Sequence, residues 1–253
     1  MTPFGFQLYT ARDVPSFPAL LTDLATMGYT HVEGFSGVYA DPHAFRSAMD
    51  GAGLTMPSGH FGLADLRDDF DTCAGIARTL GVQTIIAPFL DEADRPVDAG
   101  GYKALASDLD SLKSRCADEG LGFAWHNHAF ELEPLQDGSI GMDVILTEAP
   151  DVAWEADMAW VIRGGADPMA WVDQYGSRMV AVHVKDIAPA GENADQDGWA
   201  DLGAGTVDWP GLITAITAQA GNTVLWIAEH DNPRDPRAFA SGAIGAFREW
   251  SAA

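Results

Sequence analysis

Four apolar segments of this chain end on side chains that bind metal ions or transfer protons, and this feature limits the folds open to it. The segments are residues 122–128, 152–157, 180–187 and 224–230. An apolar run of about four to eight residues has the length of a buried strand. In a barrel of parallel strands, the carboxyl ends of all the strands meet at one face. The four segments therefore predict a barrel with a polar site at its mouth.

Strand-like and helix-like segments alternate along the whole chain. The predicted strands are residues 4–10, 30–35, 54–60, 82–88, 122–126, 152–157, 179–184 and 223–228. The predicted helices are one that ends at Gly28, followed by residues 41–51, 70–80, 102–119, 140–148, 168–175, 209–219 and 236–250. This alternation predicts an α/β fold, a single (β/α)8 TIM barrel covering residues 1–253. An open doubly wound sheet is the competing topology.

Two observations favour the closed barrel over the open sheet. Polar side chains end strands around the whole chain, whereas an open sheet concentrates its site at one switch point. Gly203 and Gly205 lack the third glycine of a dinucleotide-binding fingerprint and follow no apolar strand. Residues 188–201 are rich in Gly, Asp and Asn, and we expect them to form a long mobile loop over the site.

Charge and cysteine content exclude several classes of partner. The 253 residues include 37 acidic and 14 basic side chains, and the formal net charge of −23 repels nucleic acids and anionic membrane surfaces. Cys73 and Cys116 are too few for a disulfide framework, which fits a reducing compartment. The sequence shows neither a signal peptide nor a membrane span. We therefore expect a soluble, cytoplasmic protein.

The polar strand ends suit a metal site. His183 and Asp186 end one apolar run, and Asp157, Glu229 and His126 end others. A single histidine in such a place would be a core residue about as often as a ligand, but equivalent residues on neighbouring strands favour the ligand interpretation. Mixed carboxylate and imidazole ligands suit one divalent metal ion, Mn²⁺, Mg²⁺, Co²⁺ or Zn²⁺. The absence of thiolates argues against a structural zinc site.

Several short motifs carry a resemblance that covers most of the chain. They are the run at residues 28–33, the strand-end residue His60, the His-x-Lys-Asp run at residues 183–186, and the Gly-rich run at residues 202–209. In these motifs the chain resembles the xylose isomerase-like TIM-barrel superfamily, the sugar phosphate isomerase/epimerase group. Members of that group hold one metal ion at the ends of strands five to eight. The resemblance assigns Asp157, His183 and Glu229 to three of these positions.

The fifth strand departs from the usual family pattern. The family's glutamate ligand falls on His126, and the run from His126 to Glu131 resembles the branch that reads His-Asn-His-x-Phe-Glu. His126, His128 and Glu131 therefore stay open as the fourth ligand, with His126 as the first choice. A neutral imidazole brings no negative charge, so we expect the bound ion to be a stronger Lewis acid.

The resemblance implies proton transfer on a sugar. A metal that binds a sugar's carbonyl and hydroxyl oxygens stabilises the enediolate formed when the neighbouring proton is removed. Glu229 is the expected base, and His126 or His128 the group that returns the proton. The other residues expected to bind substrate, carry protons or form an apolar wall are Glu33, His60, Glu131, Lys185, Asp186, Trp125 and Trp160. For Glu33 and Lys185 a salt bridge, and for the tryptophans core packing, is the alternative.

The leading hypothesis is a metal-dependent isomerase or epimerase acting on a small-molecule sugar or sugar derivative. A dehydratase or lyase acting on a keto-sugar or keto-inositol is the first alternative, because the fifth strand has lost a carboxylate. A non-catalytic sugar-binding barrel is the second. An AP endonuclease is the weakest hypothesis, because the net charge of −23 opposes DNA binding. A homo-oligomer stays open.

Overall fold

The strands of the computed structural model, which describes residues 2–251, close into one parallel barrel. Its strands are β1 (Gly5–Gln7), β2 (His31–Gly34), β3 (Thr55–His60), β4 (Thr84–Ala87), β5 (Gly122–His126), β6 (Ala153–Asp157), β7 (Met179–Val184) and β10 (Leu225–Ala228). Strand β1 pairs with β2 on one side and with β10 on the other, which leaves no sheet edge. The predicted (β/α)8 TIM barrel is confirmed, and the open sheet is excluded.

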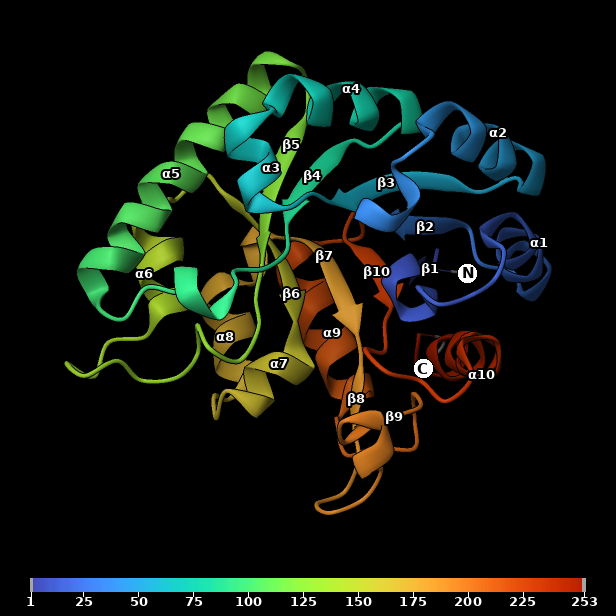
Figure 1. Cartoon of the computed structure of the whole chain (residues 1–253). Helices are drawn as coiled ribbons and strands as arrows, with labels where there is room; N and C mark the ends of the chain where they lie inside the picture. The colour runs from blue at the N-terminus through green and yellow to red at the C-terminus, as the bar shows by residue number, and fades with distance from the viewer. Residues whose placement is uncertain (1, 252–253) are drawn as a thin grey trace.

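Helices surround the strands on the outside (Figure 1). They are α1 (Phe17–Met27), α2 (Pro42–Ala52), α3 (Leu63–Asp68), α4 (Phe70–Leu80), α5 (Ala99–Asp118), α6 (Gly141–Glu148), α7 (Met158–Arg163), α8 (Pro168–Tyr175), α9 (Trp209–Ala220) and α10 (Pro236–Trp250). Many begin at a residue whose carboxylate accepts a backbone N–H, as Asp41, Asp98 and Asp235 do. Within residues 2–251, no helix is long and apolar enough to cross a membrane.

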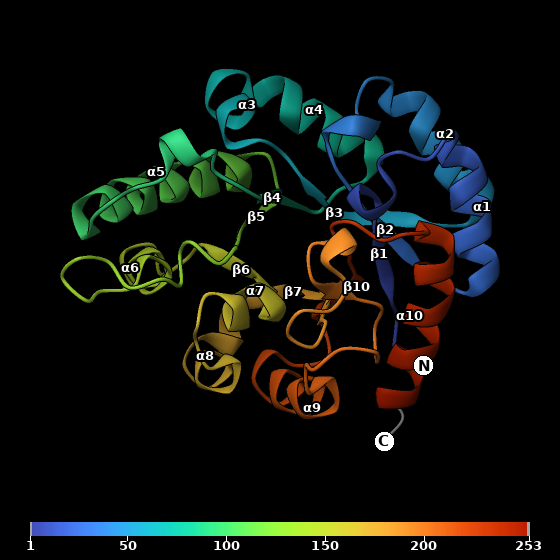
Figure 2. The same ribbon diagram turned by 60° about the horizontal axis from the view of Figure 1, so that its bottom comes forward.

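The apolar core lies between the strands and the helix ring. Phe123, Trp125 and Trp154 point outward from β5 and β6 and are buried in this layer. The two ends of the described chain meet here as well, because the rings of Phe4 and Phe247 stack with centroids 4.0 Å apart. Helix α10 therefore packs beside β1 and α1 (Figure 2). With the outward side chains buried under helices, the barrel interior is left to the polar residues.

The structure differs from the elements predicted from the sequence in three respects. Strand β1 stops at Gln7, because the Gln7 side chain accepts the backbone N–H of Tyr9 and starts a 3-10 helix at Leu8–Ala11. Helices α3 and α7 were not predicted. Most of the loop expected at residues 188–201 connects two short antiparallel strands, β8 (Asp186–Ile187) and β9 (Trp199–Ala200), and its last residues include β9 itself. Trp199 is 1% exposed, and its burial fixes the returning strand.

Candidate active site

Polar side chains fill the interior at the carboxyl ends of the strands. Successive side chains of a strand point to opposite sides, so residues two apart share the interior side. The inward polar residues at this end are Gln7, Glu33, Ser58, His60, His126, Glu155, Asp157, His183, Lys185 and Glu229, and all except His60 are buried. Burying so many ionisable groups is costly unless they pair or serve a function.

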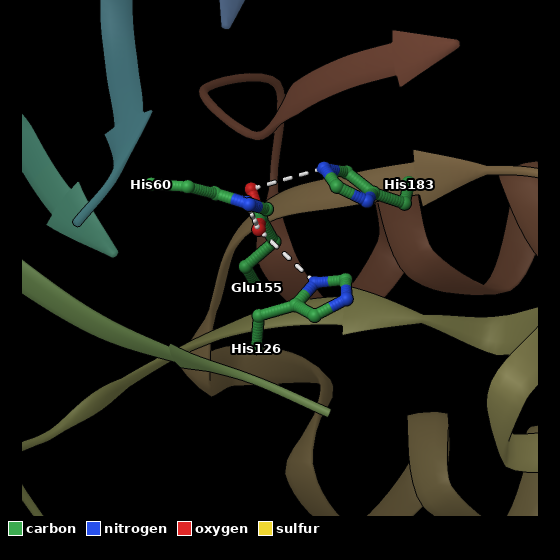
Figure 3. Close-up of side chains that lie close together, drawn as sticks. All are labelled: His60, His126, Glu155 and His183. Carbon is green, nitrogen blue, oxygen red and sulfur yellow. Dashed lines mark hydrogen bonds and ion pairs between the residues drawn. The ribbon is translucent and has the colours of Figure 1, made fainter. Parts of the chain in front are cut away.

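Three imidazoles surround the carboxylate of Glu155 (Figure 3). Glu155 Oε2 lies 2.6 Å from His60 Nε2 and 3.1 Å from His126 Nδ1, and Glu155 Oε1 lies 3.5 Å from His183 Nε2. One nitrogen or oxygen of each residue lies within 4.8 Å of those of the other three. We call His60, His126, Glu155 and His183 the histidine group.

Glu33 supports the histidine group from β2. Its Oε2 lies 2.6 Å from His183 Nε2 and 3.2 Å from His60 Nε2. Gln7 donates to the same oxygen at 2.8 Å, and Ser58 donates to the other. Because both carboxylate oxygens accept hydrogen bonds from fixed neighbours, Glu33 orients the imidazoles of His60 and His183. Glu33 does not line the cavity above them.

A second group of ionisable residues surrounds the ammonium of Lys185. Lys185 Nζ lies 3.2 Å from Asp157 Oδ2, 2.9 Å from Glu229 Oε2 and 3.0 Å from Asp231 Oδ2. We call Lys185 and these three carboxylates the lysine group. His183 joins the two groups, because its Nδ1 lies 2.8 Å from Glu229 Oε2.

Burial and neighbouring charges set the protonation of both groups. Burial by itself would lower the pKa of His60, but Glu155 and Glu33 outweigh it and raise the pKa to about 9. Burial and the charge of Glu33 raise the pKa of Glu155 to about 7. Burial opposes ionisation of Glu229, yet His183 and Lys185 hold its pKa well below the usual range. Burial lowers the pKa of His128 to about 3, so its ring is neutral. Glu229 is therefore an ionised carboxylate beside neutral and protonated imidazoles.

The donor atoms of the histidine group fit a divalent metal ion. Among the described residues, His126 Nδ1 and Glu155 Oε1 are buried without a hydrogen-bond partner, which is costly in a protein interior. Three imidazoles and one carboxylate are ligands that Zn²⁺, Co²⁺ and Mn²⁺ accept. The raised pKa of His60 means that a proton competes for the same site. His60, His126, Glu155 and His183 could thus hold the ion.

The structure divides the four ligands predicted from the sequence between two groups that share His183. His126 and His183 lie in the histidine group. One ligand atom from each of Asp157, His183 and Glu229 also lies within 4.8 Å of the other two, and Lys185 contacts both of these carboxylates. Asp157 also caps α7 through Oδ1, which accepts the backbone N–H of Trp160 at 2.8 Å. Lys185 already supplies a positive charge to both carboxylates, so a metal ion gains less there than in the histidine group.

Sequence reasoning missed Glu155 and Asn127. Glu155 precedes Asp157 by two residues on β6, so the strand periodicity places both carboxylates in the interior. This signal was present in the sequence. Asn127 lies between the two histidines of β5, where its side chain accepts from the backbone N–H of Asp157 at 3.0 Å and donates to its carbonyl at 3.1 Å. Asn127 thereby fixes the end of β6 against β5.

The candidates that follow β5 lie in different surroundings. His126 joins the histidine group, whereas Glu131 is fully buried and accepts from Trp125 Nε1 at 3.2 Å and from the backbone N–H of His128 at 2.9 Å. Glu131 and Trp125, for which contact with substrate was predicted, do not line the cavity. Glu131 instead holds the loop that carries His128. Burial raises the pKa of Glu131 to about 8.

Asp186 also has a different role from the one predicted. Its Oδ1 accepts the backbone N–H groups of Ile187 at 2.9 Å and Val207 at 3.1 Å. Its Oδ2 accepts those of Gly203 at 3.0 Å and Gly205 at 3.1 Å. A Cβ atom on Gly205 would lie 2.1 Å from Asp186 Oδ1, so the Gly-rich run is required for this close approach. Asp186 fixes the loop between β9 and α9 and does not contact the cavity.

Replacing Asp186 with alanine is expected to lower the free energy of unfolding by about 3 kcal/mol, because four partly buried N–H groups lose a charged acceptor. Chemical denaturation would measure the change. Asp50→Ala is the control, since Asp50 forms an exposed ion pair with Arg46, and such pairs contribute little. An equal effect in the two variants would contradict this role of Asp186.

A cavity of about 700 Å³ opens above the histidine group. His60, His126, His128 and Glu229 line its polar side, and Trp160 belongs to its apolar side. These residues therefore face the space where a substrate would bind. The members of both groups that do not line the cavity lie behind them.

Comparison with known proteins identifies a matching family and a relative of this chain. Residues 21–250 match the family described as xylose isomerase-like TIM barrel. Inosose dehydratase from Clostridium beijerinckii is 22% identical to this chain over an alignment of 204 residues, and the match covers 71% of this chain and 68% of that protein.

Two solved structures have the same fold. A sugar phosphate isomerase/epimerase from Parabacteroides distasonis has a TM-score of 0.80 at 19% identity, covering 96% of this chain and 92% of the other. The IolI protein, whose structure contains a bound zinc atom, has a TM-score of 0.79 at 14% identity and covers 98% of each chain. At these identities the likeness shows the fold alone.

Proposed function

Because this chain belongs to the xylose isomerase-like TIM barrel family, we propose that it is a metal-dependent isomerase or epimerase that moves a proton next to the carbonyl group of a sugar or sugar derivative. The observation that carries the proposal is the position of an ionised Glu229 at the cavity, beside a group of three imidazoles and a carboxylate. The zinc atom bound in the IolI structure, which has the same fold, supports a bound metal ion in this proposal.

The histidine group would hold the divalent ion in this proposal. A bound ion would polarise a carbonyl oxygen of the substrate and stabilise the negative charge that develops on it. His60 and His126 line the cavity and would orient the substrate from the same side. The carboxylate of Glu33 contacts the imidazoles of His60 and His183, and it would keep both rings in place.

Glu229 would remove the proton. Its contacts with His183 and Lys185 both use Oε2, so Oε1 is the oxygen available to a substrate in the cavity. Its lowered pKa keeps the carboxylate ionised, which a general base requires. Lys185 is fully buried and would act as a positioning residue that keeps Glu229 charged and aligned.

The return of the proton decides the product. His128 lines the cavity on the β5 side, and its neutral ring can orient a substrate hydroxyl group by a hydrogen bond. β5 and β10 are not neighbours in the barrel, so His128 and Glu229 approach the substrate from different directions. Transfer to the adjacent carbon gives isomerisation, and transfer to the opposite face gives epimerisation.

A dehydratase is the second candidate function, and the relative from Clostridium beijerinckii, an inosose dehydratase, favours it. The first step is the same removal of a proton beside a carbonyl group. The two reactions differ afterwards, because a dehydratase loses the hydroxyl group on the next carbon and an isomerase keeps it. Glu229, which holds the removed proton, would pass it to the leaving hydroxyl group, so that water is released.

A test of the function follows solvent deuterium into substrate. Metal-loaded protein in D₂O is expected to label keto-sugars or keto-inositols at the carbon beside the carbonyl group, as NMR would detect. Glu229→Gln should slow the exchange by about 10²–10⁴-fold, the usual contribution of a general base. Glu119→Gln is the control, since Glu119 is an exposed partner of Arg78.

The products would separate the candidate functions. A labelled isomer or epimer supports the isomerase or epimerase, whereas loss of water seen by mass spectrometry supports the dehydratase. Metal-loaded protein that exchanges no deuterium with any carbonyl sugar would contradict both, and it would favour a non-catalytic sugar-binding barrel.

A further inference from the structure

Aromatic rings form a continuous wall on one side of the cavity. The wall consists of Phe89, His128, Phe130, Trp160 and Trp199, which come from the segments that follow β4, β5 and β6 and from β9. The ring centroids of Phe89 and His128 are 5.0 Å apart, those of His128 and Trp160 5.3 Å, and those of Trp160 and Trp199 4.7 Å. Contacts at these separations hold the rings in fixed positions.

Two more aromatic rings face the cavity from the other side of the barrel. Tyr9 follows β1 and Phe35 follows β2, and their centroids are 5.6 Å apart. In the closed order of the strands, β1 is opposite β5 and β2 is opposite β6. The mouth of the cavity therefore has aromatic surfaces on opposing sides.

These rings extend beyond what one sugar bound at the histidine group would cover. Tyr9 is 39% exposed and Phe89 is 40% exposed, and in the described chain they are two of the four large apolar side chains with this much exposure. The cavity of about 700 Å³ is within the range of sites that enclose ligands of several rings. Exposed apolar surface collected around one cavity is typical of a ligand-binding surface.

Charge around the cavity disfavours a phosphorylated ligand. The acidic residues that line it are Asp65, Glu133, Asp197, Glu229 and Asp231, and the arginines are Arg95 and Arg163. Both guanidinium groups lie over the wall, Arg95 at 4.1 Å from the centroid of Phe130 and Arg163 at 3.2 Å from that of Trp199. Carboxylates thus outnumber arginines in this lining, which disfavours a phosphate group bound away from the histidine group.

The geometry points to an uncharged glycoside as the ligand, with its first sugar at the histidine group and a second flat group against the aromatic wall. The inference rests on the proposed function, since it takes the first sugar to be the reacting one. The second group is either another sugar ring or an aryl ring, because both present a flat apolar face to an aromatic side chain.

The test compares matched glycosides by isothermal titration calorimetry on the full chain, with its metal content measured beforehand. For glucose, galactose, mannose and xylose, the methyl glycoside is titrated beside the phenyl glycoside and a disaccharide with the same first sugar. In at least one series the phenyl glycoside or the disaccharide should bind roughly tenfold more tightly than the methyl glycoside, from its extra ring contacts. The larger of the two gains identifies the second group.

Variants of the wall locate the gain. Phe89→Ala and Phe130→Ala should remove the tenfold advantage of the extended ligand over the methyl glycoside. Met169→Ala is the control, because Met169 is 41% exposed and does not line the cavity. Retention of the full advantage in both wall variants would place the second group elsewhere and overturn the inference.

Other outcomes would overturn the inference directly. These are equal affinity of the methyl and extended glycosides in every series, no binding of any extended glycoside at millimolar concentration, or tighter binding of glucose 6-phosphate than of glucose. The titrations need no turnover, so tight binding of an extended glycoside without deuterium exchange would contradict the proposed function alone. Exchange with a simple sugar and no gain from a second ring would contradict this inference alone.

Discussion

His183→Ala is expected to remove bound divalent metal and to lower kcat/KM by about 10³-fold or more, since a metal ion contributes several kcal/mol to such a reaction. His183 contacts Glu33 and Glu155 through Nε2 and Glu229 through Nδ1. The substitution therefore removes one metal-donor atom from the histidine group and one contact partner from Glu229. Metal content by elemental analysis and the rate of deuterium exchange would measure the two effects.

The barrel is expected to stay folded in His183→Ala. Gln7 and Ser58 still donate to Glu33, and Lys185 still pairs with Glu229. Circular dichroism would verify the fold, and His43→Ala on the exposed side of α2 is the matched control. Full metal content and full activity in His183→Ala would remove this residue from the site.

Glu155→Gln and Asp157→Asn are expected to behave differently, although each replaces an interior carboxylate of β6 by an amide of nearly equal size. Glu155 lies among three imidazoles, so Glu155→Gln should weaken metal binding by about 100-fold or more, beyond the usual effect of a residue that only orients a ligand. Asp157 contacts Lys185 and caps α7. Asp157→Asn should therefore keep the metal.

Titration of metal-free protein with Zn²⁺ and with Mn²⁺ would measure both affinities. Unfolding midpoints would verify that neither variant has lost its fold. The reverse outcome, metal loss in Asp157→Asn and normal binding in Glu155→Gln, would show that the ion lies with Asp157, His183 and Glu229, as the family resemblance implies. Lys185 would then have to move away from both carboxylates when the ion binds.

Much of the fold could be predicted because its signals are local. Each strand is a short apolar run, and the end of the first helix is marked by Gly28, whose positive φ of 101° suits glycine. Two short helices were missed because α3 and α7 have only 6 residues each. Periodicity in so few residues gives no signal above the background of a loop.

The candidate site was predictable in part for the same reason. His60, His126, His183 and Glu229 end apolar strands, and the structure brings all of them to one end of the barrel. Glu155 could have been found as well, because it shares the interior side of β6 with Asp157. Which of these residues meet around one point could not be read from any single strand.

The sequence by itself determined the alternating order of strands and helices and the end of the strands at which polar side chains collect. Both follow from periodicity and strand direction, which act within about ten residues. Only the tertiary structure decided that Lys185 neutralises Asp157 and Glu229, that Glu155 lies among three imidazoles, and that Asp186 binds backbone amides. These contacts join strands far apart in the chain. They depend on the stagger of the strands around the barrel and on the side-chain rotamers, which no local pattern specifies.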